Sequence, residues 1–161
     1  MADDVVVTNQ PNNPVPVKAV DEPLPVRVVN DFRAQNAFQK CLEDDLEPGF
    51  EVPFNFEIPD GKRLVIELIT AQVLVPAGER ARLRLVTYSG TDVYKFDLAL
   101  TSQGRVGGQA EVLVATHAIR AYADKHPSPN EDFQVNVNRD NKETPGHALI
   151  CVSGYLVDLA A

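Results

Sequence analysis

Apolar and polar residues alternate along most of the chain from Phe50 onward. In the segment EVPFNFEI, residues 51–58, every second side chain is apolar, and the positions between them hold polar residues and Pro53. A period of two is the pattern of a half-buried β-strand. Proline has no N–H to donate to a neighbouring strand, so Pro53 predicts that this strand lies at the edge of its sheet.

Later segments alternate in the same way, and the turns PDGK (59–62) and PAGE (76–79) separate the first of them. The run RLVIELITAQVLV, 63–75, is apolar on both faces, which predicts a strand in the middle of a sheet. Strands are also expected at 110–123 and 147–159. Side chains expected to face the core elsewhere are Ala81, Leu83, Leu85, Thr87, Tyr94, Phe96, Leu98, Leu100, Phe133, Val135 and Val137.

Two segments are harder to assign. Residues 31–45, DFRAQNAFQKCLEDD, fit either a helix or a strand around 38–42, and the glycine-rich SQGRVGGQ, 102–109, is predicted as a loop. Seven strands with a candidate eighth predict an all-β fold, an antiparallel β-sandwich of jelly-roll-like form. We expect this domain at residues 37–161, preceded by an extended arm rich in proline and valine at 1–36.

The arm repeats one pattern nine residues apart, NPVPVKAV and then EPLPVRVV. Proline at alternate positions presets extended geometry, so the segment is straight even without partners. Its valines need a surface to cover them, and three placements stay open: a solvated linker, packing on its own sandwich, or contact with another copy of the chain. We favour contact with another copy, made by Pro14, Val15, Pro16, Val17, Pro23, Leu24, Pro25, Val26 and Val28.

Composition narrows the partners. The 161 residues include 15 basic and 23 acidic side chains, a net charge of −8, which argues against a nucleic-acid partner because phosphate binding needs clustered Lys and Arg. No apolar run reaches the roughly 18 residues of a membrane-spanning helix, so no membrane insertion is expected. The start MADDVVVTNQ lacks the basic residues of a secretory signal. We expect a cytoplasmic protein, or one exported by another route as part of a particle.

Motifs for catalysis are not found in the sequence. His117, His126 and His147 occur in no H-x-H or H-E-x-x-H spacing, which fails the His-x-His pattern of cupin metalloenzymes, and His117 is interpreted as a half-buried strand residue. A nucleophile elbow, a Walker loop and a dinucleotide fingerprint are also missing. We therefore predict a protein that is not an enzyme, with no cofactor and no metal site. The acidic run EDDLE, 43–47, leaves Ca²⁺ binding open against a solvated turn.

The two cysteines, Cys41 and Cys151, are far apart in the sequence and fit no metal or redox spacing. Free cysteine is among the most buried residue types. They are therefore predicted to be two buried free thiols.

Two surface features suit a ligand. Tyr88 and Asp92 lie in TYSGTD, and Asp124, His126 and Asn130 lie in or beside the loop DKHPSPNED, so they form a candidate surface for a glycan or another small ligand. Arg80, Arg82 and Arg84 alternate along one strand and form a candidate anion-contacting stripe. The alternative, which we favour, is an exposed face whose charges are matched by acids on the adjacent strand.

The segments DGKRLVIELITAQVLVPAGE, AIRAYAD and VSGYLVDL resemble a group of small, uncharacterised bacterial β-sandwich proteins. These proteins pair a Pro/Val-rich leader with a P-x-G-K-R-L-V-I-E strand and a carboxy-terminal S-G-Y-L-V-D strand. The resemblance implies a sandwich fold and brings no catalytic residues with it. We expect a structural or adhesive protein that forms homo-oligomers through its arm, with a glycan-binding or small-ligand-binding module as the alternative.

Overall fold

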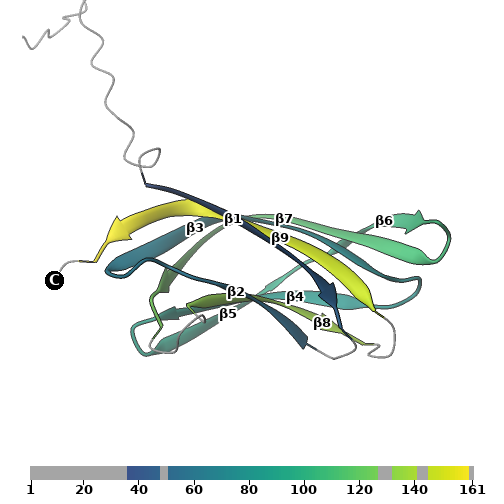
Figure 1. Cartoon of the computed structure of the whole chain (residues 1–161), viewed down its shortest axis with the longest axis horizontal. Helices are drawn as coiled ribbons and strands as arrows, with labels where there is room; N and C mark the ends of the chain where they lie inside the picture. Colours follow the sequence, from purple (N-terminus) through teal and green to yellow (C-terminus); the bar gives the residue numbers. More distant parts are fainter. Residues whose placement is uncertain (1–35, 48–50, 127–131, 141–144, 160–161) are drawn as a thin grey trace, which may run out of the picture.

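The computed structural model describes residues 36–47, 51–126, 132–140 and 145–159. All the regular structure in these ranges is β, without a helix among them, and it forms two antiparallel sheets that lie one over the other (Figure 1). The prediction of an all-β, sandwich-like fold is therefore confirmed. Residues 1–35, which contain nearly all of the predicted arm, lie outside the described ranges.

Nine strands are present in the described part of the chain. The five-stranded sheet has the order β1 (Ala37–Leu46), β9 (Gly146–Asp158), β3 (Lys62–Pro76), β7 (Ala110–Asp124) and β6 (Thr101–Val106). The four-stranded sheet has the order β2 (Glu51–Phe56), β8 (Phe133–Arg139), β4 (Ala81–Ser89) and β5 (Asp92–Leu98). As predicted, β3 is central, and β2 with its Pro53 lies at an edge.

Of the helix and the strand left open for residues 31–45, the strand is confirmed, whereas the prediction of a loop at 102–109 is wrong for residues 102–106. Residues 37–46 form β1 and no helix, because alternate side chains from Phe38 to Leu42 turn toward the core while the backbone pairs with β9. The segment predicted as a glycine-rich loop contains β6, whose pairing with β7 is irregular between Ser102 and Arg105. Gly104, with φ of 96°, lies inside this irregularity, where a positive φ favours glycine.

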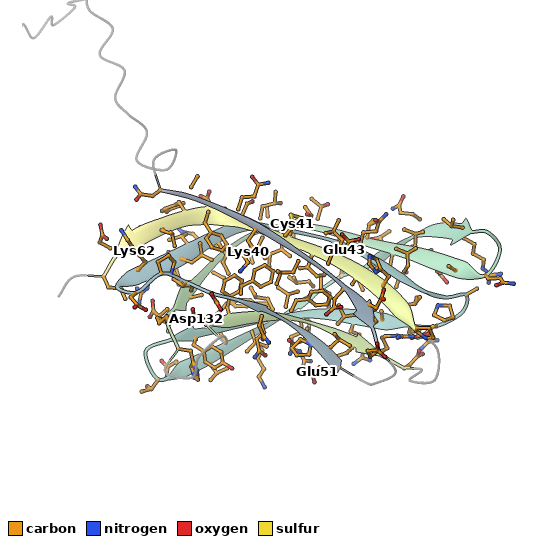
Figure 2. The ribbon with its side chains drawn as sticks, viewed as in Figure 1. Lys40, Cys41, Glu43, Glu51, Lys62 and Asp132 are labelled. Carbon is orange, nitrogen blue, oxygen red and sulfur yellow. A yellow bond between two sulfur atoms is a disulfide. The ribbon has the colours of Figure 1, made fainter. Side chains whose placement is uncertain are left out.

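The core fills the space between the sheets, as the side chains in Figure 2 show. Phe56 and Phe133 stack with ring centroids 4.8 Å apart, and Phe38 meets Phe133 edge-on at 6.3 Å. Phe54 is 3% exposed, so its predicted inward position is confirmed. The core is thus built from apolar faces of both sheets, which is the arrangement of a sandwich.

Tyr94 and Phe96 face the core side of their sheet, as predicted, but they are not buried. Their phase is the expected one, because Tyr94 lies opposite Thr87 and Phe96 opposite Leu85, and both of those β4 residues are fully buried. However, β5 is an edge strand, and Tyr94 and Phe96 remain 46% and 37% exposed. Facing the other sheet does not bury a side chain that lies beyond the area the other sheet covers.

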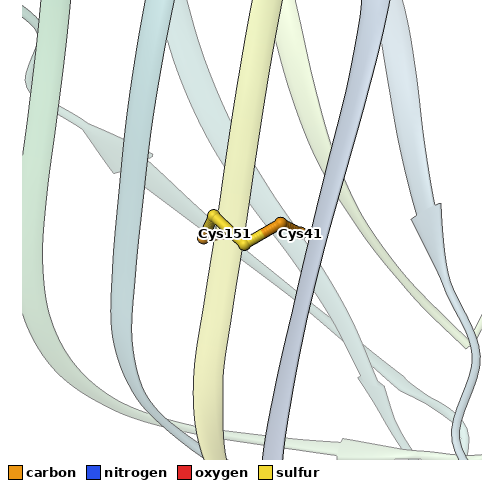
Figure 3. The surroundings of a disulfide bond; sticks show 2 residues. All are labelled: Cys41 and Cys151. Atoms are coloured by element: carbon orange, nitrogen blue, oxygen red, sulfur yellow. A yellow bond between two sulfur atoms is a disulfide. The ribbon is translucent and has the colours of Figure 1, made fainter.

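The prediction of two free thiols is also wrong, since Cys41 and Cys151 form a disulfide. The antiparallel register of β1 and β9 places them directly opposite each other, with Cα atoms 4.0 Å apart (Figure 3). Cys41 is exposed, so the bond lies on the outer face of the five-stranded sheet. It ties the first strand of the domain to the last.

Replacing both cysteines by serine is expected to lower the free energy of unfolding by about 2–4 kcal/mol. The crosslink spans 110 residues, and a loop of that length restricts the unfolded chain strongly. Urea titrations with and without reductant measure the effect. Reductant should move the wild-type transition to that of the double variant and leave the variant unchanged, whereas a loss below about 1 kcal/mol would contradict the prediction.

Buried polar groups fasten the ends of strands. Asp132, fully buried between the sheets (Figure 2), accepts hydrogen bonds from the backbone N–H groups of Ile58 at 2.6 Å and His126 at 2.9 Å. The guanidinium of Arg139 pairs with Glu79, where both side chains are almost fully buried, and donates to the carbonyl of Leu46 at 3.1 Å. These groups connect segments that lie far apart in the sequence.

Candidate functional site

Part of the predicted site lies outside the described residues. This applies to the arm residues, Pro14, Val15, Pro16, Val17, Pro23, Leu24, Pro25, Val26 and Val28, and to Asn130 of the candidate ligand surface. The remaining predicted residues can be placed.

Tyr88 and His126 lie together, as expected for one surface. Their ring centroids are 4.3 Å apart with an interplanar angle of 42°, although the residues come from β4 and from the end of the segment after β7. Asp92 is exposed at the start of β5, where it contacts the hydroxyl of Tyr94 at 3.5 Å. Tyr88 and His126 thus offer a small aromatic patch, with Asp92 close by in the sequence.

Asp124 has a structural role in this region. Its carboxylate accepts hydrogen bonds from Arg63 Nε at 2.6 Å, Arg63 Nη2 at 2.8 Å, Ser89 Oγ at 3.1 Å and the Gly90 N–H at 3.2 Å. The Arg63 guanidinium, followed by the Ser89 hydroxyl and the Gly90 amide, holds the pKa of Asp124 below its usual range, against the opposing effect of burial. Asp124 and Arg63 of one sheet therefore clamp the β4–β5 turn of the other.

Next to this clamp is a hollow that the sequence did not predict, which we call the β5–β7 cleft. It has a volume of about 260 Å³ and is lined by Arg63, Thr87, Ser89, Tyr94, Phe96, Arg120, Ala121 and Tyr122. The cleft lies between the edge strand β5 and the part of β7 beyond Val114, which β6 does not cover within the described residues. It opens there because neither sheet extends far enough to cover the other.

The lining of the cleft combines aromatic and polar groups. Tyr94, Phe96 and Tyr122 are each between 37% and 46% exposed. The Oγ1 of Thr87 is buried and has no hydrogen-bond partner within the described part of the chain. Aromatic walls with a few polar groups are typical of small-ligand sites, although this volume lies slightly below their usual range of roughly 300–1,000 Å³.

The arginine stripe is partly neutralised. Arg84 Nε donates to Asp97 on the adjacent strand β5 at 2.8 Å, and this hydrogen bond raises the pKa of Arg84 and lowers that of Asp97. The favoured alternative, a face matched by neighbouring acids, is confirmed for Arg84. Arg80 and Arg82 form no ion pair within 4 Å among the described residues, and both line an open hollow of about 340 Å³ with Asn138, Arg139 and Asp140.

Two acidic side chains of the segment 43–47 contact a histidine. His147 Nδ1 lies 3.0 Å from Asp45 Oδ1, and its Nε2 lies 2.9 Å from Glu43 Oε1. The hydrogen bond to Asp45, followed by that to Glu43, raises the pKa of His147 above its ordinary value. Across the described ranges, no group of three or more His, Cys, Asp or Glu side chains is placed to hold a metal ion. The geometry of this segment is that of a charged contact between β1 and β9.

His117 lies in the middle of β7, where its Nε2 is 2.8 Å from the carbonyl oxygen of Ala99. Its side chain is intermediate in exposure, which confirms the interpretation as a half-buried strand residue. It anchors the connection between β5 and β6.

Comparison with known proteins provides no family assignment: no protein-family model matches the chain, and no curated protein matches it. In the part of the chain that the structure describes, no helix is long and apolar enough to cross a membrane.

Proposed function

We propose that the two-sheet fold is a jelly roll. The order β1-β9-β3-β7 in one sheet and β2-β8-β4-β5 in the other supports this assignment, because the first four strands alternate between sheets and the last two return between earlier ones. This is the double Greek-key order of eight-stranded jelly rolls, with β6 added beside β7. Jelly rolls occur in capsid and lectin domains, so the fold is compatible with assembly and with ligand binding.

We further propose that the protein is a structural or adhesive protein without enzymatic activity, which assembles with copies of itself through the arm at residues 1–36. The observation that carries this proposal is the combination of a Pro/Val arm, which its prolines make stiff, with a sandwich whose edge strands have an unpaired side among the described residues. A free edge accepts an extended segment through backbone hydrogen bonds.

The disulfide supports a location outside a reducing cytosol. Disulfides persist in oxidising surroundings and are rare where glutathione keeps thiols reduced. Of the two locations expected from the sequence, export as part of a particle fits Cys41–Cys151 better.

Deleting residues 2–30 is expected to reduce the native mass to that of a single chain. The full chain has a mass of 17.7 kDa, so light scattering after size-exclusion chromatography distinguishes a monomer from an assembly. A control variant carries a Gly/Ser segment of the same length in place of the arm, and it should also be monomeric. An unchanged mass in the deletion variant would remove the proposal.

A second candidate function is binding of a glycan or another small ligand, and the β5–β7 cleft favours it, because the buried Thr87 hydroxyl there has no hydrogen-bond partner among the described residues. A saccharide array screened with the wild type, Phe96→Ala and Tyr88→Ala tests it. Binding that is lost in Phe96→Ala supports the cleft, and binding lost in Tyr88→Ala supports the Tyr88–His126 patch. No binding by the wild type contradicts this candidate.

A further inference from the structure

We propose that residues 23–29 of one copy add as an extra strand to the free edge of β5 in another copy and cover the β5–β7 cleft. This inference rests on the proposed assembly through the arm, and it names the surface that receives the arm.

The edge strand β5 exposes three large apolar side chains. It ends the four-stranded sheet, so one side of its backbone has no strand partner within the described residues. Val93, Tyr94 and Phe96 are exposed to 51%, 46% and 37% along this short strand, beside the charged Asp92, Lys95 and Asp97. Natural proteins protect free edges with Lys, Pro or bulges to prevent pairing with other chains. On β5 the protection is a single lysine, and the exposed apolar surface favours a partner strand.

The other sheet edges fit a strand less well. The edge strand β2 contains Pro53, which lacks a donor, and β6 has glycine and an irregular register. The edge strand β1 exposes no large apolar side chain among the described residues, and its exposed positions include Glu43, Asp44 and Asp45. This comparison leaves β5 as the edge best suited to the arm.

The arm has the backbone pattern of a strand with one usable edge. In a strand, successive residues turn their backbone groups to opposite sides. Pro23 and Pro25 therefore remove donors from one side, whereas Leu24, Val26 and Val28 keep theirs on the other. Such a segment pairs fully with one sheet edge and offers a poor edge to a further chain, so the added strand stops growth of the sheet.

The length of residues 23–29 and the positions of their side chains also fit the edge of β5. Residues 23–29 number seven, as does β5. Leu24, Val26 and Val28 share one face of an extended chain, and this face can cover Tyr94 and Phe96 at the mouth of the cleft. Preset extended geometry lowers the conformational entropy lost on docking.

The acidic side chains lie beside the docked segment and not on it. Residues 23–29 carry only Arg27, whereas residues 1–31 as a whole contain five acidic and two basic side chains, a net charge of −3. Arg82 on β4 and Arg120 on β7 are exposed near this side of the molecule, and neither has an ion pair within 4 Å among the described residues. Opposite charges at the rim mainly raise the association rate and fix the register.

A pair of matched variants tests the docking surface in the full chain. Val93→Lys places a charge on the β5 edge, and Val106→Lys places the same charge on β6, where Val106 is 59% exposed compared with 51% for Val93. We expect Val93→Lys to lower the native mass to that of one chain, and Val106→Lys to keep the wild-type mass. Far-UV circular dichroism checks that both variants are folded, and both should be, because both side chains are exposed.

Photocrosslinking locates the contact directly. A photoreactive amino acid replaces Val26 in the full chain, and a mixture of ¹⁵N-labelled and unlabelled copies distinguishes crosslinks between chains from those within a chain. We expect mixed-isotope crosslinks to peptides containing residues 92–98. Crosslinks that stay within one chain, or that map to β1, β2 or β6, would overturn the inference.

The outcomes separate the inference from the proposed function. If the arm deletion lowers the mass but Val93→Lys does not, assembly through the arm stands and the β5 docking surface is wrong. If both lysine variants lower the mass equally, the β5 edge is not specific, and the inference again fails. If the arm deletion leaves the native mass unchanged, both the proposed function and the inference are wrong.

Discussion

Glu79→Ala is expected to lower the free energy of unfolding by about 3–5 kcal/mol. The pair that it breaks is almost fully shielded from water, with side-chain exposure of 2% for Glu79 and 0% for Arg139. The guanidinium of Arg139 is a charged group, so the variant leaves it buried without the carboxylate that neutralises it. Urea denaturation measures the loss.

A control variant and a double-mutant cycle test this prediction further. Glu57→Ala removes an exposed glutamate close to the same sheet and should change the free energy of unfolding by less than about 0.5 kcal/mol. In a double-mutant cycle, Glu79→Ala with Arg139→Ala should cost less than the sum of the two single changes, because neither charge is then left alone. Additive losses would show that Glu79 and Arg139 do not act as a pair.

Phe54→Ala and Phe96→Ala are expected to differ strongly although both remove the same side chain. Phe54 is 3% exposed and belongs to the core, so its loss should lower the free energy of unfolding by about 3–5 kcal/mol. Phe96 is 37% exposed at the edge of a single domain, so in a chain that lacks residues 2–30, where no arm can cover it, its loss should cost less than about 1 kcal/mol. Thermal unfolding of the two variants in this shortened chain, run side by side, measures the difference. Equal losses there would contradict the exposed position of Phe96 in the single domain.

The alternation of apolar and polar residues predicted most of the strands, because a strand that buries one face has apolar side chains at every second position. Pro53 predicted an edge position for β2, and apolar residues on both faces predicted a central position for β3. Both predictions are confirmed. The predicted inward phase of Phe96 is also correct, because phase depends on the strand alone. Burial depends in addition on the opposite sheet, and this information is not contained in the strand.

The features that the sequence did not predict all depend on pairing between distant segments. Cys41 meets Cys151 because β1 pairs with β9 in a particular register, and the two strands are separated by most of the domain. Glu79 meets Arg139 across 60 residues for the same kind of reason. The β5–β7 cleft arises from the relative extent of two sheets. The sequence feature that pointed to the cleft was the pair of aromatic residues Tyr94 and Phe96 on a short strand that follows a tight turn.

The Cys41–Cys151 bond also determines how the domain responds to mechanical load. If the arm holds a neighbouring copy, tension enters the domain at the start of β1 and acts to peel this strand away from β9. Peeling would open the pairs of Ala37 through Lys40 and then stop at the covalent bond four residues in. Beyond that point the force passes into β9, which is flanked by strands on both sides. The domain can therefore act as a tether point that resists unzipping while its arm is under strain.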